Sequence, residues 1–229
     1  MGKPFLYILF LLAACSATPE NPDPHREFNK DMLEFNLALD KNILKPTALA
    51  YRDVVPDVAR ESISDFLANL KEPFYSINYI VTCDAEHAAN SLFRFVINST
   101  LGIIGLFDVG EQIGLEKTEI SHQSTLKKFD VPLGDYLVLP ILGSSSTRDA
   151  IAEPIAWFAD PVGYFIGFPF MLAKYVLTAI SDRAENANLI DSTIHNSMDI
   201  YSTTKSMYLQ KYGDMSTNAD DIFLDDEED

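Results

Sequence analysis

Side chains that would suit covalent catalysis are few in this sequence and far apart. Ser144, Ser145 and Ser146 offer hydroxyl groups, and His122 and Asp149 are the acid–base residues to consider with them. No G-x-S-x-G elbow surrounds the serines. An enzyme that acts on phospholipid or cell wall is nevertheless kept as an alternative, with Ser145, His122 and Asp149 as the residues to test.

Metal and cofactor chemistry has no recognisable motif either. The four histidines, His25, His87, His122 and His195, are scattered, and Glu86-His87 has no second ligand at the spacing of a metal site. The sequence contains no P-loop and no dinucleotide-binding fingerprint. We therefore expect a protein that is not an enzyme and that needs no metal and no cofactor.

The clearest chemical signal is at the amino terminus. Lys3 precedes an apolar run from Phe5 to Leu12, and Leu12-Ala13-Ala14-Cys15 has the form of a bacterial lipobox. The run is too short to span a bilayer and fits the core of an export signal. Residues 1–14 are therefore predicted to be a signal peptide and Cys15 a lipidated residue. Several acyl chains, at about 0.8 kcal/mol per buried methylene, would form a durable anchor.

The residues that follow the lipobox indicate the destination. Ser16 stands where many bacteria place the aspartate that retains lipoproteins at the inner membrane, so we expect the outer membrane of a Gram-negative bacterium, on its periplasmic side. Residues 15–24 contain three prolines and are predicted to be an extended, lipidated tether. Once Cys15 is acylated, Cys83 is the only thiol of the mature chain, so an intrachain disulfide is excluded.

The charge balance restricts the partners. The chain has 17 basic and 34 acidic residues, a net charge of −17, and no basic cluster that could bind phosphates, which excludes nucleic acid. Electrostatic docking on an anionic membrane surface is also excluded, so membrane contact must be hydrophobic or covalent. Eight acidic residues and no basic one follow Lys211, and residues 213–229 are predicted to be an acidic, disordered tail.

Apolar spacing predicts one helical domain over residues 25–212. One helix is expected from His25 to Leu44, ended by Lys45-Pro46, and a second from Asp57 to about Leu70, ended near Glu72-Pro73. Phe74–Val81 fits a helix or a strand. Further helices are expected after Asp84, over Lys174–Ile190 and over Asp191–Tyr212, whereas Val131–Gly143 is expected to be irregular.

Two stretches contain too few charged residues for an ordinary water-exposed surface. Ser91–Asp108 begins with helical spacing, is expected to turn through Asn98-Ser99-Thr100, and carries only two charged residues, so it must lie deep in a core or against lipid. Pro161–Ala173 has no charge over thirteen residues, which is too short for a membrane-spanning helix but long enough to lie within one leaflet or beneath it.

Many short motifs occur in one order between about Asp23 and Tyr212. They are Phe28-Asn29-Lys30-x-Met32, Phe35-Asn36, Lys45-Pro46, Tyr51-Arg52, Val55-Pro56, Asn69-Leu70-x-Glu72-Pro73, Arg94-Phe95-x-x-Asn98-Ser99-Thr100-Leu101-Gly102, Gly105-Leu106-Phe107-Asp108, Gly134-x-Tyr136, Leu139-Pro140, Gly143, Arg148-Asp149 and Asp160-Pro161. With the lipobox, they give a chain that resembles the MlaA (VacJ) family of outer-membrane lipoproteins.

This resemblance implies an all-α fold: a ring-shaped bundle of amphipathic and apolar helices, embedded in one membrane leaflet around a central amphipathic channel. It implies passage of mislocalised outer-leaflet phospholipids to a periplasmic lipid carrier protein, beside a trimeric porin that would contact Pro154–Ala173. Phe35 and Asn36 fall where the family's first helix influences the channel. The channel or gate residues implied are Phe35, Asn36, Gly134, Tyr136 and Gly143.

The sequence departs from the family in one loop. Where the family has an aromatic residue and glycines, this chain has His122-Gln123-Ser124-Thr125-Leu126-Lys127, and it lacks glycines near Asp130 and Pro132. Backbone conformations that need glycine in the family's loop are therefore not expected in the loop of this chain. An envelope scaffold that binds porins without transporting lipid remains a second alternative.

Overall fold

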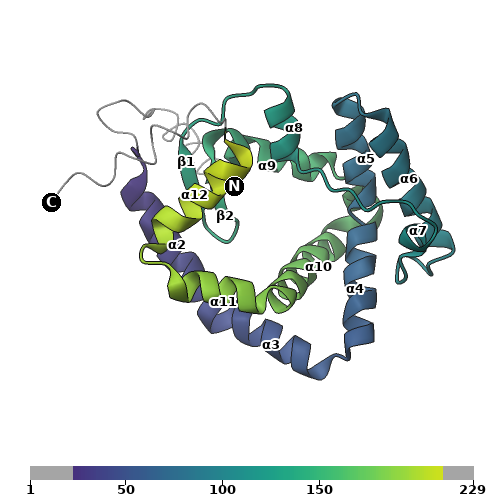
Figure 1. The fold of residues 1–229 in the computed structure, drawn as a ribbon, viewed down its shortest axis with the longest axis horizontal. Helices are drawn as coiled ribbons and strands as arrows, with labels where there is room; N and C mark the ends of the chain where they lie inside the picture. Colours follow the sequence, from purple (N-terminus) through teal and green to yellow (C-terminus); the bar gives the residue numbers. More distant parts are fainter. Residues whose placement is uncertain (1–22, 214–229) are drawn as a thin grey trace. The chain divides into compact units, whose positions relative to one another are not determined.

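The computed structural model describes residues 23–213, and the expectation of a mostly helical chain is confirmed (Figure 1). The predicted signal peptide, Cys15, most of the tether and nearly all of the acidic tail lie outside the described residues. The chain divides into two compact units. Within the described part, unit 1 holds residues 23–39, 126–154 and 193–213, and unit 2 holds residues 40–125 and 155–192.

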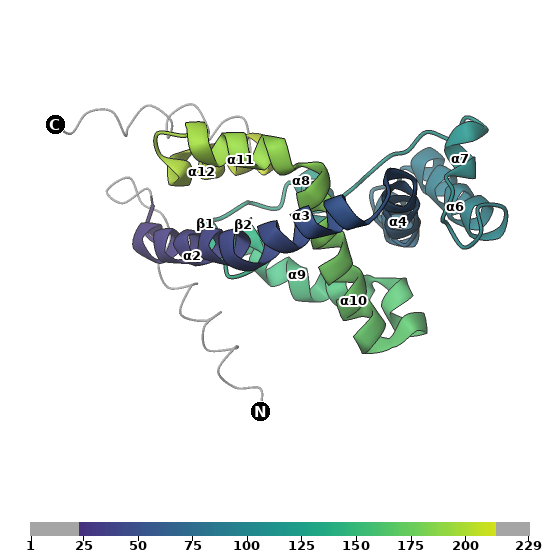
Figure 2. The ribbon, with the colours of Figure 1, turned by 90° about the horizontal axis from the view of Figure 1, so that it is seen from below.

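Unit 1 is built on a helix beside a β-hairpin. Helix α2 (Arg26–Leu39) packs against the antiparallel strands β1 (Tyr136–Leu139) and β2 (Gly143–Ser146), and α12 (Ile200–Tyr212) contacts β2 (Figure 2). Its core is a tyrosine cluster. Tyr136, Tyr201 and Tyr208 pack with Val138, and Met32 and Leu33 of α2 cover them.

Unit 2 contains most of the other helices. These are a π-helical turn (Asp40–Leu44), α3 (Lys45–Val54), α4 (Asp57–Asn69), α5 (Glu72–Val81), α6 (Ala85–Thr100), α7 (Val109–Gln112) and α10 (Pro161–Glu185). Three more helices, α8 (His122–Lys128), α9 (Thr147–Ala159) and α11 (Ala187–Asn196), run from one unit into the other. Helix α5 packs along α6, and α10 packs along α3.

An ion-pair network joins the carboxyl-terminal end of α10 and the middle of α11 to the π-helical turn and the first residue of α3. Arg183 binds Asp40 with Nε at 2.7 Å and Asp191 with Nη2 at 2.6 Å, and Lys45 Nζ lies 2.8 Å from Asp191. The two cations and two carboxylates balance, and the Arg183 side chain is buried. This network fixes the first helical turns of unit 2.

The prolines are the main source of error in the predicted helix ends. Lys45-Pro46 does not end the first helix, because the backbone continues through the π-helical turn and Pro46 lies in the first turn of α3. Similarly, α4 already ends at Asn69, and Pro73 lies in the first turn of α5, which settles residues 74–81 as helix. A proline in a first turn costs no hydrogen bond, since those N–H groups have no intrahelical acceptor.

Three further predictions are corrected. Val131–Gly143 is not irregular throughout, because residues 136–139 form β1. The turn expected at Asn98-Ser99-Thr100 comes after Thr100, where α6 ends. The single helix expected over Asp191–Tyr212 is two helices, since α11 ends at Asn196 and the Asp199 side chain caps α12 by accepting the Tyr201 N–H at 2.9 Å.

Candidate functional site

The β-hairpin of unit 1 brings together several of the predicted site residues. Its register pairs Tyr136 with Ser146 and Leu139 with Gly143, which leaves residues 140–142 as the connecting loop. The sequence Gly-Ser-Ser-Ser of β2 has little preference for a strand, so pairing and side-chain contacts must hold it. One such contact joins the Tyr136 hydroxyl to Ser144 Oγ at 2.8 Å.

Two asparagines of α2 bind the backbone of this hairpin. Asn29, fully buried, donates Nδ2 to the Tyr136 carbonyl at 2.9 Å and accepts the Val138 N–H at 2.8 Å. Asn36 donates Nδ2 to the Leu139 carbonyl at 2.9 Å and accepts the Ile141 N–H at 2.7 Å. A side-chain amide that binds both an N–H and a carbonyl replaces the partners that a third strand would supply. Helix α2 therefore holds the strand through Asn29 and the loop through Asn36.

The spacing of these asparagines explains the geometry. They lie seven residues apart, which is two helical turns, so both side chains leave α2 on the same side. Each follows a phenylalanine, and Phe28 and Phe35 are both exposed. The repeated Phe-Asn pair thus presents an amide to the hairpin and a ring away from it.

The two predicted glycines flank β1. Gly134 precedes β1 with φ +72°, and Gly143 begins β2 with φ +81°, a left-handed backbone that side chains rarely adopt. A Cβ on Gly134 would lie 3.1 Å from Thr147 Cβ, whereas a Cβ on Gly143 would meet no atom within 4 Å. Asn36, Tyr136 and both glycines are therefore parts of one hairpin assembly, and Phe35 lies beside it on α2.

The base of the hairpin is closed by buried polar contacts. Arg148 donates Nε to Asp149 at 2.7 Å and Nη1 to the Val131 carbonyl at 3.1 Å, and the Tyr208 hydroxyl donates to the other Asp149 oxygen. Burial, and then the hydrogen bond to Asp149, raise the pKa of Tyr208, so this hydroxyl stays protonated and able to donate. The Asp149 carboxylate considered above for catalysis is thus committed to Arg148 and Tyr208.

A second polar cluster lies inside unit 2, between α5, α6 and α7. Arg94 of α6, 1% exposed, binds Glu72 with Nε at 2.8 Å and Asp108 with Nη2 at 2.5 Å, and donates Nη1 to the Leu115 carbonyl at 2.6 Å. Asn98 donates to Asp108 at 3.0 Å and accepts the Gly110 N–H at 2.8 Å. We call Glu72, Arg94, Asn98 and Asp108 the Arg94 cluster.

The two carboxylates of the Arg94 cluster respond differently to their surroundings. Burial raises the pKa of Glu72, and the hydrogen bond from Arg94 only partly offsets this. Burial also opposes ionisation of Asp108, but hydrogen bonds from the Glu111 N–H, Arg94 and Asn98 hold its pKa below the ordinary value. Asp108 is therefore the stronger acid of the two.

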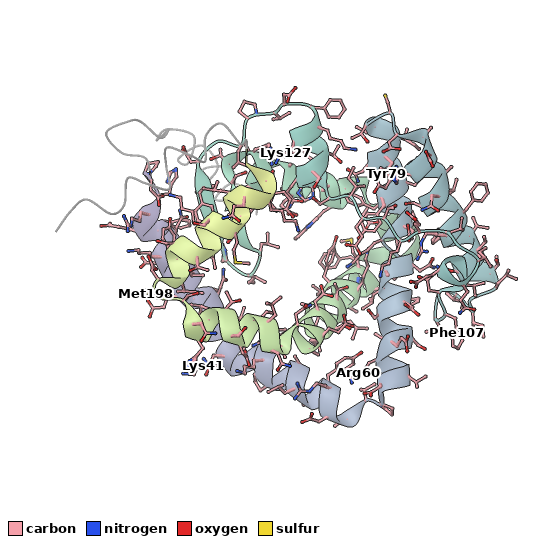
Figure 3. The ribbon with its side chains drawn as sticks, in the orientation of Figure 1. Lys41, Arg60, Tyr79, Phe107, Lys127 and Met198 are labelled. Carbon is pink, nitrogen blue, oxygen red and sulfur yellow. The ribbon has the colours of Figure 1, made fainter. Side chains whose placement is uncertain are left out.

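Helix α6 is amphipathic in the reverse of the usual sense. Its buried side carries Ser91, Arg94 and Asn98 together with Ala88. Its apolar residues and those of the following turn are exposed, with Ile104 at 68%, and Figure 3 shows Phe107 at the outer edge of that turn. The other members of this apolar surface are Leu92, Phe93, Val96, Leu101 and Ile103. The stretch expected in a core or against lipid is therefore not in a core.

The start of α10 has the same arrangement. Lys174 Nζ lies 2.8 Å from Asp160 Oδ2, and both side chains are buried. Apolar side chains of the same helix are exposed, including Phe168 and Phe170 at 70% each. The ring of Trp157 packs against Tyr175 with centroids 5.9 Å apart. Among the residues described, no helix is both long enough and apolar enough to cross a membrane.

The comparisons with known proteins identify the family of this chain. The profile of the family described as MlaA lipoprotein matches residues 21–214, which is most of the chain. The chain belongs to the MlaA lipoprotein family. An MlaA protein of Escherichia coli strain K12, named "Intermembrane phospholipid transport system lipoprotein MlaA", is 34% identical over 213 residues, covering 88% of this chain and 83% of that protein.

Further relatives extend the MlaA match. An uncharacterised protein of Rickettsia bellii is 34% identical over 186 residues, covering 80% of this chain and 72% of that protein. A solved structure described as "Structural basis for maintenance of bacterial outer membrane lipid asymmetry" covers 83% of this chain and 97% of its own, with 34% identity and a TM-score of 0.73. The sequence and the fold of the chain therefore point to the same family.

Sequence reasoning did not find the roles of Asn29, Glu72 and Arg94, although all three stand in the motifs shared with the MlaA family. The seven-residue repeat of Phe-Asn is the signal that could have paired Asn29 with Asn36. No comparable signal links Glu72, Arg94 and Asp108, because the spacing of apolar residues does not predict how the turns between their helices fold.

Proposed function

We propose that this chain is an outer-membrane lipoprotein that passes mislocalised outer-leaflet phospholipids through an amphipathic channel to a periplasmic lipid carrier protein. The relatives named for an intermembrane phospholipid transport system support the transport role. Residues 1–14 serve as signal peptide, Cys15 carries the lipid, residues 15–24 form the tether, residues 25–212 form the body and residues 213–229 an acidic tail.

The observation that carries this proposal is the reversed amphipathicity of α6. Helix α6 buries arginine and asparagine and exposes three large apolar side chains, and the turn that follows exposes five more. This arrangement would be destabilised in water, at roughly 25 cal/mol per Å² of apolar surface left wet. Contact with lipid removes the penalty of wetting these apolar side chains. The charged groups of α6 avoid contact with hydrocarbon because they are paired inside unit 2. We therefore place this surface in one leaflet, as for an interfacial protein that does not span.

Trp157 offers a direct test of membrane seating because it is the only tryptophan of the chain. Tryptophan and tyrosine prefer the boundary between headgroups and acyl chains, and Trp157 packs with Tyr175 beside exposed phenylalanines. We expect phospholipids brominated near the headgroup to quench its fluorescence more strongly than lipids brominated at the chain ends. Equal fluorescence in brominated and ordinary vesicles would place Trp157 outside the bilayer and contradict the seating.

We assign gating to the hairpin. Asn36 holds the loop that carries Ile141 and Leu142, two exposed apolar side chains. Loss of the Asn36 contacts would free this loop while Asn29 still holds the strand, so the loop can open or close the passage on a fixed hinge. Phe35, Gly134, Tyr136 and Gly143 complete the gate in this proposal, and a trimeric porin beside Pro154–Ala173 supports the body laterally.

The cellular experiment compares surface-exposed phospholipid in cells that lack this protein and in cells given back one of four chains. The native chain and the control Glu34→Ala, an exposed residue of the same helix, are expected to restore low exposure. Cys15→Ala and Asn36→Ala are expected to fail. If cells lacking the protein show no rise in exposed phospholipid, transport is wrong and a porin-binding scaffold takes its place.

A further inference from the structure

Asp23, the first described residue, is held by two side chains of α12. The Tyr201 hydroxyl donates to Asp23 Oδ2 at 2.7 Å, and Lys205 Nζ lies 3.0 Å from the same oxygen. The Asp23 side chain is 13% exposed. A hydrogen bond and an ion pair that meet on one largely buried carboxylate oxygen are stronger than an exposed ion pair. The point at which residues 15–22 join the body is therefore fixed.

The Tyr201 hydroxyl also connects Asp23 to the hairpin. Asn29 Nδ2 lies 3.3 Å from the hydroxyl oxygen, and the same amide group binds the Tyr136 carbonyl and the Val138 N–H of β1. Burial raises the pKa of Tyr201, and its hydrogen bond to Asp23 adds to this, so the hydroxyl remains a donor. We call the series Asp23, Tyr201 and Asn29 the Asp23 relay.

The next residues along the chain reinforce this connection. His25 is buried, and its Nε2 lies 3.5 Å from the Asp135 carboxylate, directly before β1. The Asp135 carbonyl accepts the Thr147 N–H at 2.9 Å, across the base of the hairpin. The start of the body is thus attached to the residue that precedes β1, and that residue is itself bonded across the base of the hairpin.

The distance to the lipidated cysteine is short. Seven residues separate Cys15 from Asp23, and the eight residue-to-residue steps of a fully extended chain reach at most about 29 Å. A lipid on Cys15 would keep Asp23 within that distance of the bilayer. Whenever the Asp23 contacts break, such a tether limits where Asp23 can go and favours their re-formation through a high effective concentration.

We propose that the Asp23 relay couples the lipid anchor to the hairpin, so that attachment of the tether to the membrane increases how firmly Asn29 holds β1. This inference rests on the proposed function, because it takes Cys15 as lipidated and the hairpin as the gate. Through the Asp23 relay, the lipid anchor would stabilise the hairpin in addition to retaining the protein at the membrane. It makes the gate more stable in a protein that has reached its membrane.

The test measures amide hydrogen exchange at Val138, whose N–H binds Asn29 directly. Full-length lipidated protein in phosphatidylethanolamine–phosphatidylglycerol vesicles is compared with Cys15→Ala protein in the same vesicles. We expect exchange at Val138 to be about threefold to tenfold slower in the lipidated protein, the range that one hydrogen bond supplies. In Tyr201→Phe, which lacks the bridging hydroxyl, this difference should vanish.

Tyr212→Phe is the matched control, because it makes the same change in the same helix at a ring that packs on Tyr208. It should leave the difference intact. Asp23→Asn, which retains an acceptor for Tyr201 and removes the ion pair with Lys205, should reduce the difference and is available if Tyr201→Phe fails to fold. Equal Val138 exchange in the lipidated and Cys15→Ala proteins would overturn the relay. So would a difference between these two proteins that stays the same in Tyr201→Phe and in Asp23→Asn.

The cellular phospholipid measurement separates this inference from the proposed function. If deletion of the protein leaves exposed phospholipid unchanged while Val138 exchange depends on the anchor, transport fails and the relay stands. If deletion raises exposed phospholipid while Val138 exchange is the same with and without the lipid anchor, the relay fails and transport stands.

Discussion

Arg94 is enclosed together with both carboxylates that bind it. Removing one partner of a buried ionic cluster leaves the others charged and unpaired, which typically costs about 3–5 kcal/mol. We expect Arg94→Met to lower the free energy of unfolding of the detergent-solubilised protein by about that amount. Arg52→Met is the control, because its pair with Asp53 is exposed and should contribute little. Equal stability of the two variants would contradict a structural role for the Arg94 cluster.

Asp108 makes stability depend on pH. Its pKa in the folded protein is held below its ordinary value of 3.8, so its contribution is fully present above that pH and is lost as the pH falls through the lowered pKa. Asp108→Asn removes this contribution. We expect the variant to be less stable at neutral pH and to lose less further stability on acidification below pH 3.8, measured by denaturant unfolding at several pH values. Parallel curves for the two proteins would contradict this assignment.

Among the elements, the hairpin depends on left-handed backbone at two glycines. An L residue in that conformation costs about 1–2 kcal/mol, and asparagine tolerates it better than alanine. Gly143→Ala should therefore destabilise the protein by about 1 kcal/mol, and the control Gly143→Asn by less. Gly134→Ala should cost more than Gly143→Ala, because the added Cβ also meets Thr147. Denaturant unfolding measures all three, and a neutral Gly134→Ala would contradict the geometry of β1.

The elements also show where sequence reasoning succeeds and fails. Apolar spacing predicted most helices, because the contrast between two faces is visible whichever face is buried. It could not say which face of α6 points inward, since that depends on the Arg94 cluster, whose members lie on three elements. The hairpin was missed because β2 is held by its partner strand and by Tyr136, and its own residues carry no strand preference. The lipobox and the motifs placed the chain in its family, yet the contacts of Asn29 and Asn36 required coordinates.

Over the whole molecule, apolar side chains are exposed in both units, including Phe35, Ile104 and Phe170. Covalent lipid is therefore not the only expected attachment. A chain exported on a cleavable signal in place of residues 1–15 should still sediment with membranes after washing with high salt, because salt does not weaken hydrophobic contacts. The control is a further variant, Phe168→Ser/Phe170→Ser, which should be partly released. Complete release of the anchorless chain by buffer alone would contradict membrane seating of the body.

The reversed face of α6 also affects how the chain acquires its structure. In water, hydrophobic collapse would draw Leu92, Phe93 and Val96 inward and leave Arg94 and Asn98 hydrated, which is the opposite of the native arrangement. Under the proposed seating in lipid, the surrounding hydrocarbon phase favours the native orientation over this collapsed competitor. Denatured chain diluted into plain buffer should therefore aggregate, and the same chain diluted into micelles should recover its native form. The bilayer then takes part in selecting the fold, because the hydrocarbon phase decides which side chains of α6 are buried and which are exposed.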